Sequence, residues 1–359
     1  MAERKEREIT RRNWTARGLL LAGMLLITSC GGKEEKAVVV ETSASEASSR
    51  AESSSVAEQS SEQPAAKLSP ISGLALIDEE AQRRIVAVMF DNHYDARWQA
   101  GLSEAEIVYE YLMEGNATRY MALFLKNQPE VGPVRSARPY FVDRVMEWDA
   151  IYGHFGGSAQ ALSEISDFDL ASIDGLLYDG GVFYRTAHKE APHNAYTSIS
   201  AIRQQAAAEG HRTEPTTRSY RFGELKTAPS EKAYEVTLYY SASNVTSYTY
   251  SEGTHHYARY KDGELHLDEN TNTPLSVANI IVQFCDDEVA DQEGHQYIYQ
   301  YGTGLGLLFR DGYRIPITWS KEERGTLTRY YDESGEEIIL APGQTWIQVI
   351  DPESEVNWE

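Results

Sequence analysis

Apolar and polar residues follow two different patterns along the chain, and the change divides it into two parts. In the first part, a short apolar run at 85–90 indicates a buried strand, and apolar residues at helical spacing over 139–146 predict a helix. In the second part, strict alternation dominates, as in 234–240, with glycine-containing turns between the runs. The pattern predicts an α+β protein, with a mixed α/β domain at 68–215 whose helices lie on a sheet, followed by a mostly antiparallel β domain at 225–351.

Two junctions in the first part carry further local signals. The apolar stretches 107–113 and 119–125 flank a polar, glycine-containing loop, which predicts a hairpin. A predicted strand at 150–155 runs through Gly156-Gly157-Ser158 into a predicted helix at 159–165.

The N-terminal residues lack this patterning and predict an export signal followed by a polar spacer. A cationic segment precedes an apolar run at 18–27, which is far short of the ~20 residues that cross a bilayer as a helix. The run ends in Ile27-Thr28-Ser29-Cys30, which resembles a lipobox, so a signal peptide at 1–29 and diacylglycerol on the Cys30 thiol are predicted. An ordinary secretory signal with an incidental cysteine is the alternative. Residues 30–67, rich in Ser, Glu and Ala, predict a disordered tether.

Charge and cysteine content limit the partners of the folded part. The net charge is −22, and removal of residues 1–29, with six basic and three acidic side chains, leaves the mature chain near −25. Such a chain repels nucleic acid and anionic lipid, so neither is an expected partner and the lipid on Cys30 must provide the anchor. The only other cysteine is Cys285, so no intrachain disulfide can form once Cys30 is lipidated. This favours a Gram-positive surface.

Two polar segments of the first part predict a binding site for an anion. One has two arginines directly before the helix predicted at 139–146, and the other has glycines and a serine directly before the helix predicted at 159–165. Free amides at helix starts and guanidinium groups both favour a phosphate or carboxylate, as in a cell-wall peptide or a teichoic acid. Alternatively, the arginines pair with Asp143, Glu147 or Asp149, and the glycines only form a turn. The predicted ligand-binding residues are Arg135, Ser136, Arg138, His154, Gly156, Gly157 and Ser158.

Catalytic and metal-binding interpretations have weaker support in the sequence. Ser158 could be a nucleophile with His154 as its base, but the residues around it do not form the G-x-S-x-G elbow of such serines. A serine at a helix start more often caps the helix. His188 and His193 with nearby acids could hold zinc, but Pro192 favours a loop that acts as a binding surface. The glycines of 302–306 precede a strand rather than a helix, which excludes a dinucleotide fingerprint. We therefore expect no metal site and no cofactor.

The order of several short segments resembles the YerB-like family of bacterial surface lipoproteins, whose function is undefined. The resemblance implies two domains and a lipid-anchored location at the cell surface, and it implies no catalytic residue. The segments that carry it are residues 107–110, 132–138, 149–152 and 156–158 in the first part, and residues 279–282, 309–312, 315–321 and 342–347 in the second.

Together these patterns predict a non-catalytic, lipid-anchored protein at the outer face of the cytoplasmic membrane that recognises a cell-wall component or an envelope protein. The first alternative is an envelope hydrolase or transferase that acts on cell-wall polymers through His154 and Ser158, or through a carboxylate pair such as Glu110 and Asp143. A second alternative is the substrate-capture component of a transporter, although the pattern does not suggest two similar lobes.

Overall fold

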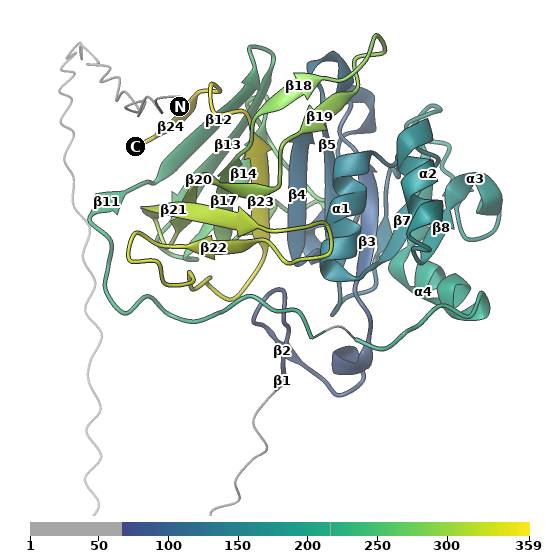
Figure 1. Cartoon of the computed structure of the whole chain (residues 1–359), viewed down its shortest axis with the longest axis horizontal. Coiled ribbons are helices and arrows are strands. Elements are labelled where there is room, and N and C mark those ends of the chain that lie inside the picture. Colours follow the sequence, from purple (N-terminus) through teal and green to yellow (C-terminus); the bar gives the residue numbers. More distant parts are fainter. Residues whose placement is uncertain (1–66, 216) are drawn as a thin grey trace, which may run out of the picture. The chain divides into compact units, whose positions relative to one another are not determined.

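One sheet of eleven strands runs through both parts of the chain in this computed structural model, which describes residues 67–215 and 217–359 (Figure 1). From edge to edge the strands follow the order β11-β21-β20-β17-β23-β4-β5-β3-β7-β8, and β22 pairs with β21. Their bounds are β3 (Val86–Asp91), β4 (Ile107–Leu112), β5 (Thr118–Phe124), β7 (Ile151–His154), β8 (Ser172–Asp174), β11 (Glu231–Lys232), β17 (Asn279–Phe284), β20 (Gly302–Arg310), β21 (Tyr313–Lys321), β22 (Arg329–Tyr331) and β23 (Thr345–Ile350).

The two parts of the chain meet where β23 pairs in parallel with β4, with Ile347 opposite Tyr109. The predicted hairpin is confirmed as the antiparallel pair of β4 and β5. The α+β prediction is confirmed as well, because helices mix with strands in the first part, and the described residues after 216 contain strands and no α-helix. The described residues belong to one compact unit, Gln63–Glu359, so the domain boundaries at 68–215 and 225–351 stay a prediction.

The predicted signal peptide and tether cannot be compared with the structure. Residues 1–29, the lipobox cysteine Cys30 and the tether up to residue 66 lie outside the described residues. Within the described residues, no helix combines the length and apolar character that crossing a membrane requires.

Helices cover both faces of the large sheet in the first part. α1 (Pro139–Trp148) and α2 (Ala159–Asp167) pack on one face, and α4 (Ile199–Ala208) packs on the other (Figure 1). Proline suits the first turn of α1 because its missing N–H would have no partner there. A single turn, α3 (Gly175–Tyr178), follows β8.

A second, six-stranded sheet packs on the same face of the large sheet as α4. Its order is β15-β14-β13-β12-β24, with β16 paired to β14. The alternation predicted for 234–240 is confirmed in β12, whose Val236 and Leu238 are buried in one core with Val108 and Trp346 of the large sheet. The bounds are β12 (Glu235–Ser241), β13 (Asn244–Ser251), β14 (His256–Lys261), β15 (Glu264–Leu265), β16 (Ser276–Val277) and β24 (Val356–Trp358).

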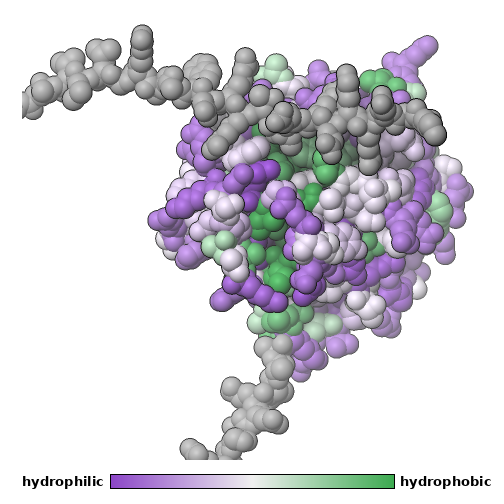
Figure 2. Space-filling model, turned by 60° about the vertical axis from the view of Figure 1, so that its left-hand side comes forward, coloured by the Kyte–Doolittle hydropathy of each residue, from purple (hydrophilic) through white to green (hydrophobic). Residues whose placement is uncertain are grey.

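The face shown in Figure 2 is mostly hydrophilic or neutral, with hydrophobic side chains gathered in a narrow strip.

Short strand pairs and 3-10 turns complete the described residues. The remaining elements are β1 (Lys67–Leu68), β2 (Ala75–Leu76), β6 (Glu130–Val131), β9 (Tyr184–Arg185), β10 (Ala195–Ser198), β18 (Asp287–Val289) and β19 (Gln296–Ile298), and the 3-10 turns η1 (Glu80–Gln82), η2 (Tyr94–Ala96), η3 (Leu102–Glu104) and η4 (Glu114–Asn116).

Buried charges tie the two parts of the chain together on both faces of the large sheet. On the face towards the second sheet, Glu110 of β4 contacts Arg259 at 2.7 Å and Lys261 at 3.3 Å, and all three side chains have no exposed surface. On the face towards α1, Glu147 contacts Arg144 and Lys321, each at 2.7 Å. A buried charge is costly without its partner, so each cluster depends on residues from both parts.

Candidate functional site

A cavity of about 830 Å³ lies between the two parts of the chain, beside the first turns of α1 and α2. Pro139 and Tyr140 of α1 and Ala159 and Gln160 of α2 form part of its wall. The opposite wall comes from the β18–β19 hairpin and from the segment that follows β21. The side chains that give it chemical character are Ser136, Arg138, Asp143, Ser158, Asp291, Glu293, His295, Tyr297, Tyr301 and Arg324.

Four of the seven predicted ligand-binding residues line this cavity. They are Ser136, Arg138, Gly157 and Ser158. The Ser158 hydroxyl accepts a hydrogen bond from the Ala161 backbone N–H at 3.3 Å, so the helix-capping interpretation of this serine is confirmed.

The other three predicted residues, Arg135, His154 and Gly156, do not line the cavity. His154 is 1% exposed, its Nδ1 contacts the Gly156 carbonyl at 2.8 Å, and its Nε2 contacts the Ser172 hydroxyl at 2.7 Å. Burial lowers the pKa of His154, although Asp174 nearby favours the charged form. Both ring nitrogens are therefore already used, and His154 does not serve Ser158 as a base.

Both predicted arginines pair with acids. The Arg138 Nε lies 2.6 Å from the Glu114 carboxylate, and the Arg135 Nε lies 2.9 Å from the Asp91 carboxylate. The alternative interpretation expected Asp143, Glu147 or Asp149 as partners, whereas the observed partners come from η4 and from the end of β3. Arg138 stays on the cavity wall, and Arg135 belongs to a separate cluster around Asp91.

Several cavity residues come from the second part of the chain and were not predicted. Arg324 contacts Asp143 at 2.9 Å and Glu164 at 3.2 Å, and so bridges α1 and α2. Burial raises the pKa of Asp143, although Tyr301 and Arg324 both favour its ionised form. His295 contacts Asp291 at 2.6 Å and lies 3.6 Å from Glu114. The closely spaced tyrosines Tyr297 and Tyr301 are the sequence feature that could have indicated this wall of the cavity.

The aromatic wall of the cavity is partly open to solvent. Tyr297 is 45% exposed and packs edge-on against Tyr299, with ring centroids 4.8 Å apart. Exposed tyrosine rings provide apolar faces with a polar tip, which suits contacts to sugars and peptides. The cavity therefore combines cationic, acidic, hydroxyl and aromatic groups.

The residues proposed for hydrolytic chemistry do not come together. Glu110 points to the face of the sheet that carries Arg259 and Lys261, whereas Asp143 lies on α1 and contacts Arg324. The pair Glu110 and Asp143 therefore cannot share one substrate, which corrects that part of the hydrolase alternative.

The structure also shows where the glycine run at 302–306, the Cys285 thiol and the two histidines of the zinc interpretation lie. Residues 302–306 belong to β20, which confirms that they are not a dinucleotide loop. Cys285 is 2% exposed, and burial raises the pKa of its thiol to about 12. His188 contacts Glu269 at 2.5 Å and His193 contacts Asp91 at 2.7 Å, so these two histidines do not converge on one ion.

Comparison with known proteins finds relatives along most of the chain. Residues 71–212 match the family described as the N-terminal domain of a protein of unknown function (DUF3048), and residues 236–347 match its C-terminal domain. The candidate lipoprotein YerB of Bacillus subtilis (strain 168) is 36% identical over 286 residues, which cover 79% of this chain and 86% of that protein. The crystal structure of the YerB protein from Bacillus subtilis matches with a TM-score of 0.75 and 32% identity, over 81% of this chain and 99% of that structure.

Proposed function

This chain belongs to the YerB-like lipoprotein family, and from that premise we propose that it is a non-catalytic surface lipoprotein that recognises a cell-wall component or an envelope protein. Diacylglycerol on Cys30 anchors it at the outer face of the cytoplasmic membrane of a Gram-positive cell. The observation that carries the proposal is the cavity of about 830 Å³, whose walls come from both parts of the chain.

We assign a ligand with a negatively charged group to the two arginines of the cavity, whose lining also holds the carboxylates of Asp143, Asp291 and Glu293. Arg138 and Arg324 bring two guanidinium groups to it, and guanidinium binds carboxylate and phosphate strongly. The first amides of α2, at Ala159 and Gln160, have no carbonyl within the helix to bond to, and the helix dipole adds a positive potential there. A carboxylate or phosphate of a cell-wall polymer fits these groups.

The contacts of Ser158 and His154 do not support catalysis in this cavity. The Ser158 hydroxyl caps α2, and both ring nitrogens of His154 contact groups other than Ser158. A serine hydroxyl becomes a reactive nucleophile when a base lies within hydrogen-bond reach of it. We therefore assign the cavity to recognition.

Retention on purified cell wall tests this proposal. The chain lacking residues 1–29, with Cys30→Ser, keeps the whole compact unit Gln63–Glu359 and needs no detergent. We expect wild type to be retained and Arg138→Ala with Arg324→Ala to lose at least tenfold in affinity. Arg83→Ala is the matched control because Arg83 pairs with Glu79 away from the cavity, and it should bind like wild type.

Three outcomes would contradict parts of the proposal. Equal retention of the double variant would exclude the cavity as the binding site. Release of soluble wall fragments that stops in Ser158→Ala would replace recognition by hydrolysis. Failure of wild type to bind wall would exclude the wall component, and cross-linking of the same variants in cells would then have to reveal an envelope protein at the cavity.

A further inference from the structure

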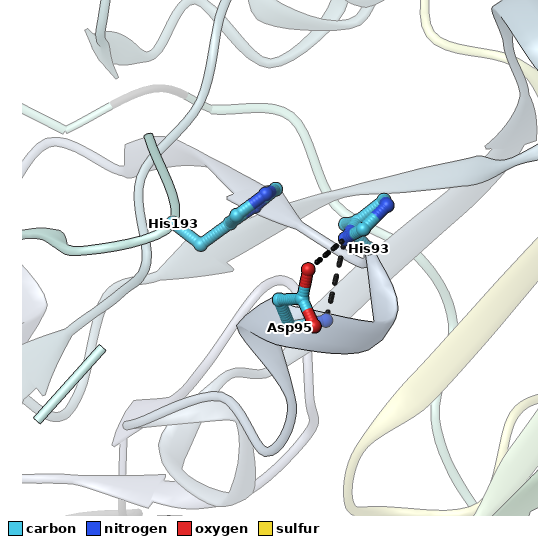
Figure 3. Close-up of side chains that lie close together, drawn as sticks. All are labelled: His93, Asp95 and His193. Carbon is cyan, nitrogen blue, oxygen red and sulfur yellow. Dashed lines mark hydrogen bonds and ion pairs between the residues drawn. The ribbon is translucent and has the colours of Figure 1, made fainter. Parts of the chain in front are cut away.

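Three side chains that could bind a metal ion converge outside this cavity. His93 and Asp95 lie at η2, directly after β3, and His193 lies in the loop between β9 and β10. One potential ligand atom from each residue lies within 4.8 Å of those of the other two. Figure 3 shows the His93 and Asp95 side chains turned towards each other, with the His193 ring beside them.

Asp91 fixes the orientation of His193. The His193 Nδ1 lies 2.7 Å from one Asp91 carboxylate oxygen. Asp91 is itself held by Arg135 at 2.9 Å and by the His93 backbone N–H at 2.9 Å. A carboxylate oxygen only accepts hydrogen bonds, so Nδ1 carries the proton and Nε2 is the nitrogen left to bind a metal ion. Histidines that bind metals are commonly held in this way by a carboxylate.

His93 and Asp95 present two electron-pair donors at a short distance. The His93 Nδ1 accepts a hydrogen bond from the Asp95 backbone N–H at 3.3 Å, so this nitrogen carries a lone pair, which a bound ion would take over from that N–H. It lies 3.4 Å from the Asp95 carboxylate oxygen. Two ligands of tetrahedral zinc, with bonds of about 2.0–2.1 Å, lie about 3.3 Å apart, so this pair already has the required separation.

The third ligand requires His93 to rotate out of its stack with His193, because imidazole lone pairs lie in the ring plane and two parallel rings do not converge on one ion. The His93 and His193 rings are stacked, with centroids 4.5 Å apart, and the side chain of His93 is 53% exposed. Rotation of His93 is therefore not hindered by tight packing, whereas His193, at 12% exposure, is the fixed ligand.

The donor atoms and the surroundings select the class of ion. Two imidazole nitrogens and one carboxylate oxygen suit zinc and related divalent transition metals, while calcium and magnesium prefer all-oxygen sites. Asp95 and His193 also line a second cavity of about 690 Å³. Remaining coordination positions on a bound ion would therefore face solvent and could accept water or an external ligand.

We propose that His93, Asp95 and His193 form a binding site for a divalent transition metal of the zinc class, with Asp91 as the positioning residue for His193. Neighbours along the sequence give no sign of this site, since β3 and the loop before β10 come together only in the folded chain. The site is independent of the function proposed for the larger cavity.

Titration of the chelator-treated chain with Zn²⁺ alone, followed by calorimetry, tests the site. We expect one ion per chain, and at least tenfold weaker binding in His93→Ala and in His193→Gln. His188→Ala is the matched control, because His188 lines the same second cavity but contacts Glu269, and it should bind zinc like wild type. Cobalt(II) should give the visible absorption of a low-coordinate site in wild type and lose it in His93→Ala.

The melting temperatures of the metal-free variants separate loss of a ligand from loss of the fold. His93→Ala removes an exposed side chain, so its metal-free melting temperature should match that of wild type. Absence of zinc binding in wild type would overturn the proposal, as would unchanged affinity in His93→Ala. Equal loss of affinity in His188→Ala and His93→Ala would show that the ion lies elsewhere in the second cavity and would also refute the assignment.

Discussion

Replacing Glu110 by glutamine removes the anion that the buried cations Arg259 and Lys261 share. The Glu110 carboxylate contacts Arg259 at 2.7 Å and Lys261 at 3.3 Å, and all three side chains are fully buried. Breaking a buried ion pair by removing one partner costs about 3–5 kcal/mol, because the remaining charge stays desolvated. We therefore expect the free energy of unfolding to fall by about 3–5 kcal/mol in Glu110→Gln.

Urea unfolding at neutral pH, followed by tryptophan fluorescence, measures this loss. Trp346 is a suitable reporter because the Arg259 guanidinium lies 4.0 Å from the centre of its ring. Glu79→Gln is the control, since Glu79 is 75% exposed and its pairing with Arg83 should be worth about 0.5 kcal/mol or less. Combining Glu110→Gln with Lys261→Met should recover part of the loss, because one unpaired cation is removed.

Two results would refute this reasoning. A loss below about 1 kcal/mol would mean that the cluster is hydrated or rearranges without cost. A double variant that loses the full sum of both single effects would mean that Glu110 and Lys261 do not interact.

Three further predictions concern single groups. Burial lowers the pKa of Lys261 to about 8, so above that pH the unfolded state binds more protons than the folded state. The free energy of unfolding of wild type should therefore rise by about 1–2 kcal/mol between about pH 8 and about pH 9.5. Lys261→Met should lack this rise in the same urea assay. The Cys285 thiol, with its pKa raised to about 12 by burial, should react with a thiol reagent at least a hundredfold more slowly in the native state than in urea; equal rates would contradict its burial. Gly306→Ala would place a Cβ 2.6 Å from the Val282 carbonyl oxygen and should cost about 1–3 kcal/mol in urea unfolding, whereas Gly325→Ala, with nothing within 4 Å, should be close to neutral.

The sequence predicted those features that depend on neighbours along the chain. The hairpin of β4 and β5, the start of α1 at Pro139 and the capping role of Ser158 all follow from periodicity, backbone geometry or a side chain within a few residues. These signals are local because a turn or a helix end is formed by consecutive residues.

The sequence did not predict features that depend on distant segments. Arg138 pairs with Glu114 and not with an acid of the helix that follows it, and Arg324 reaches the cavity from the segment after β21. Such partners are selected by packing of the completed sheet, and no spacing rule in one sequence identifies them. The prediction accordingly named four residues of the wall from the first part and missed the wall from the second part.

The position of β23 has a consequence for the order in which the protein can fold. Residues 345–350 lie between β17 and β4, so they join the two parts of the sheet although they are synthesised long after β4. Until residues 345–350 have been synthesised, the backbone N–H and C=O groups along one edge of β4 have no partner strand. Such an unpaired edge can pair with another chain. A nascent chain that contains the whole first part is therefore still an aggregation hazard, and cellular factors that hold it unfolded until synthesis is almost complete would protect it.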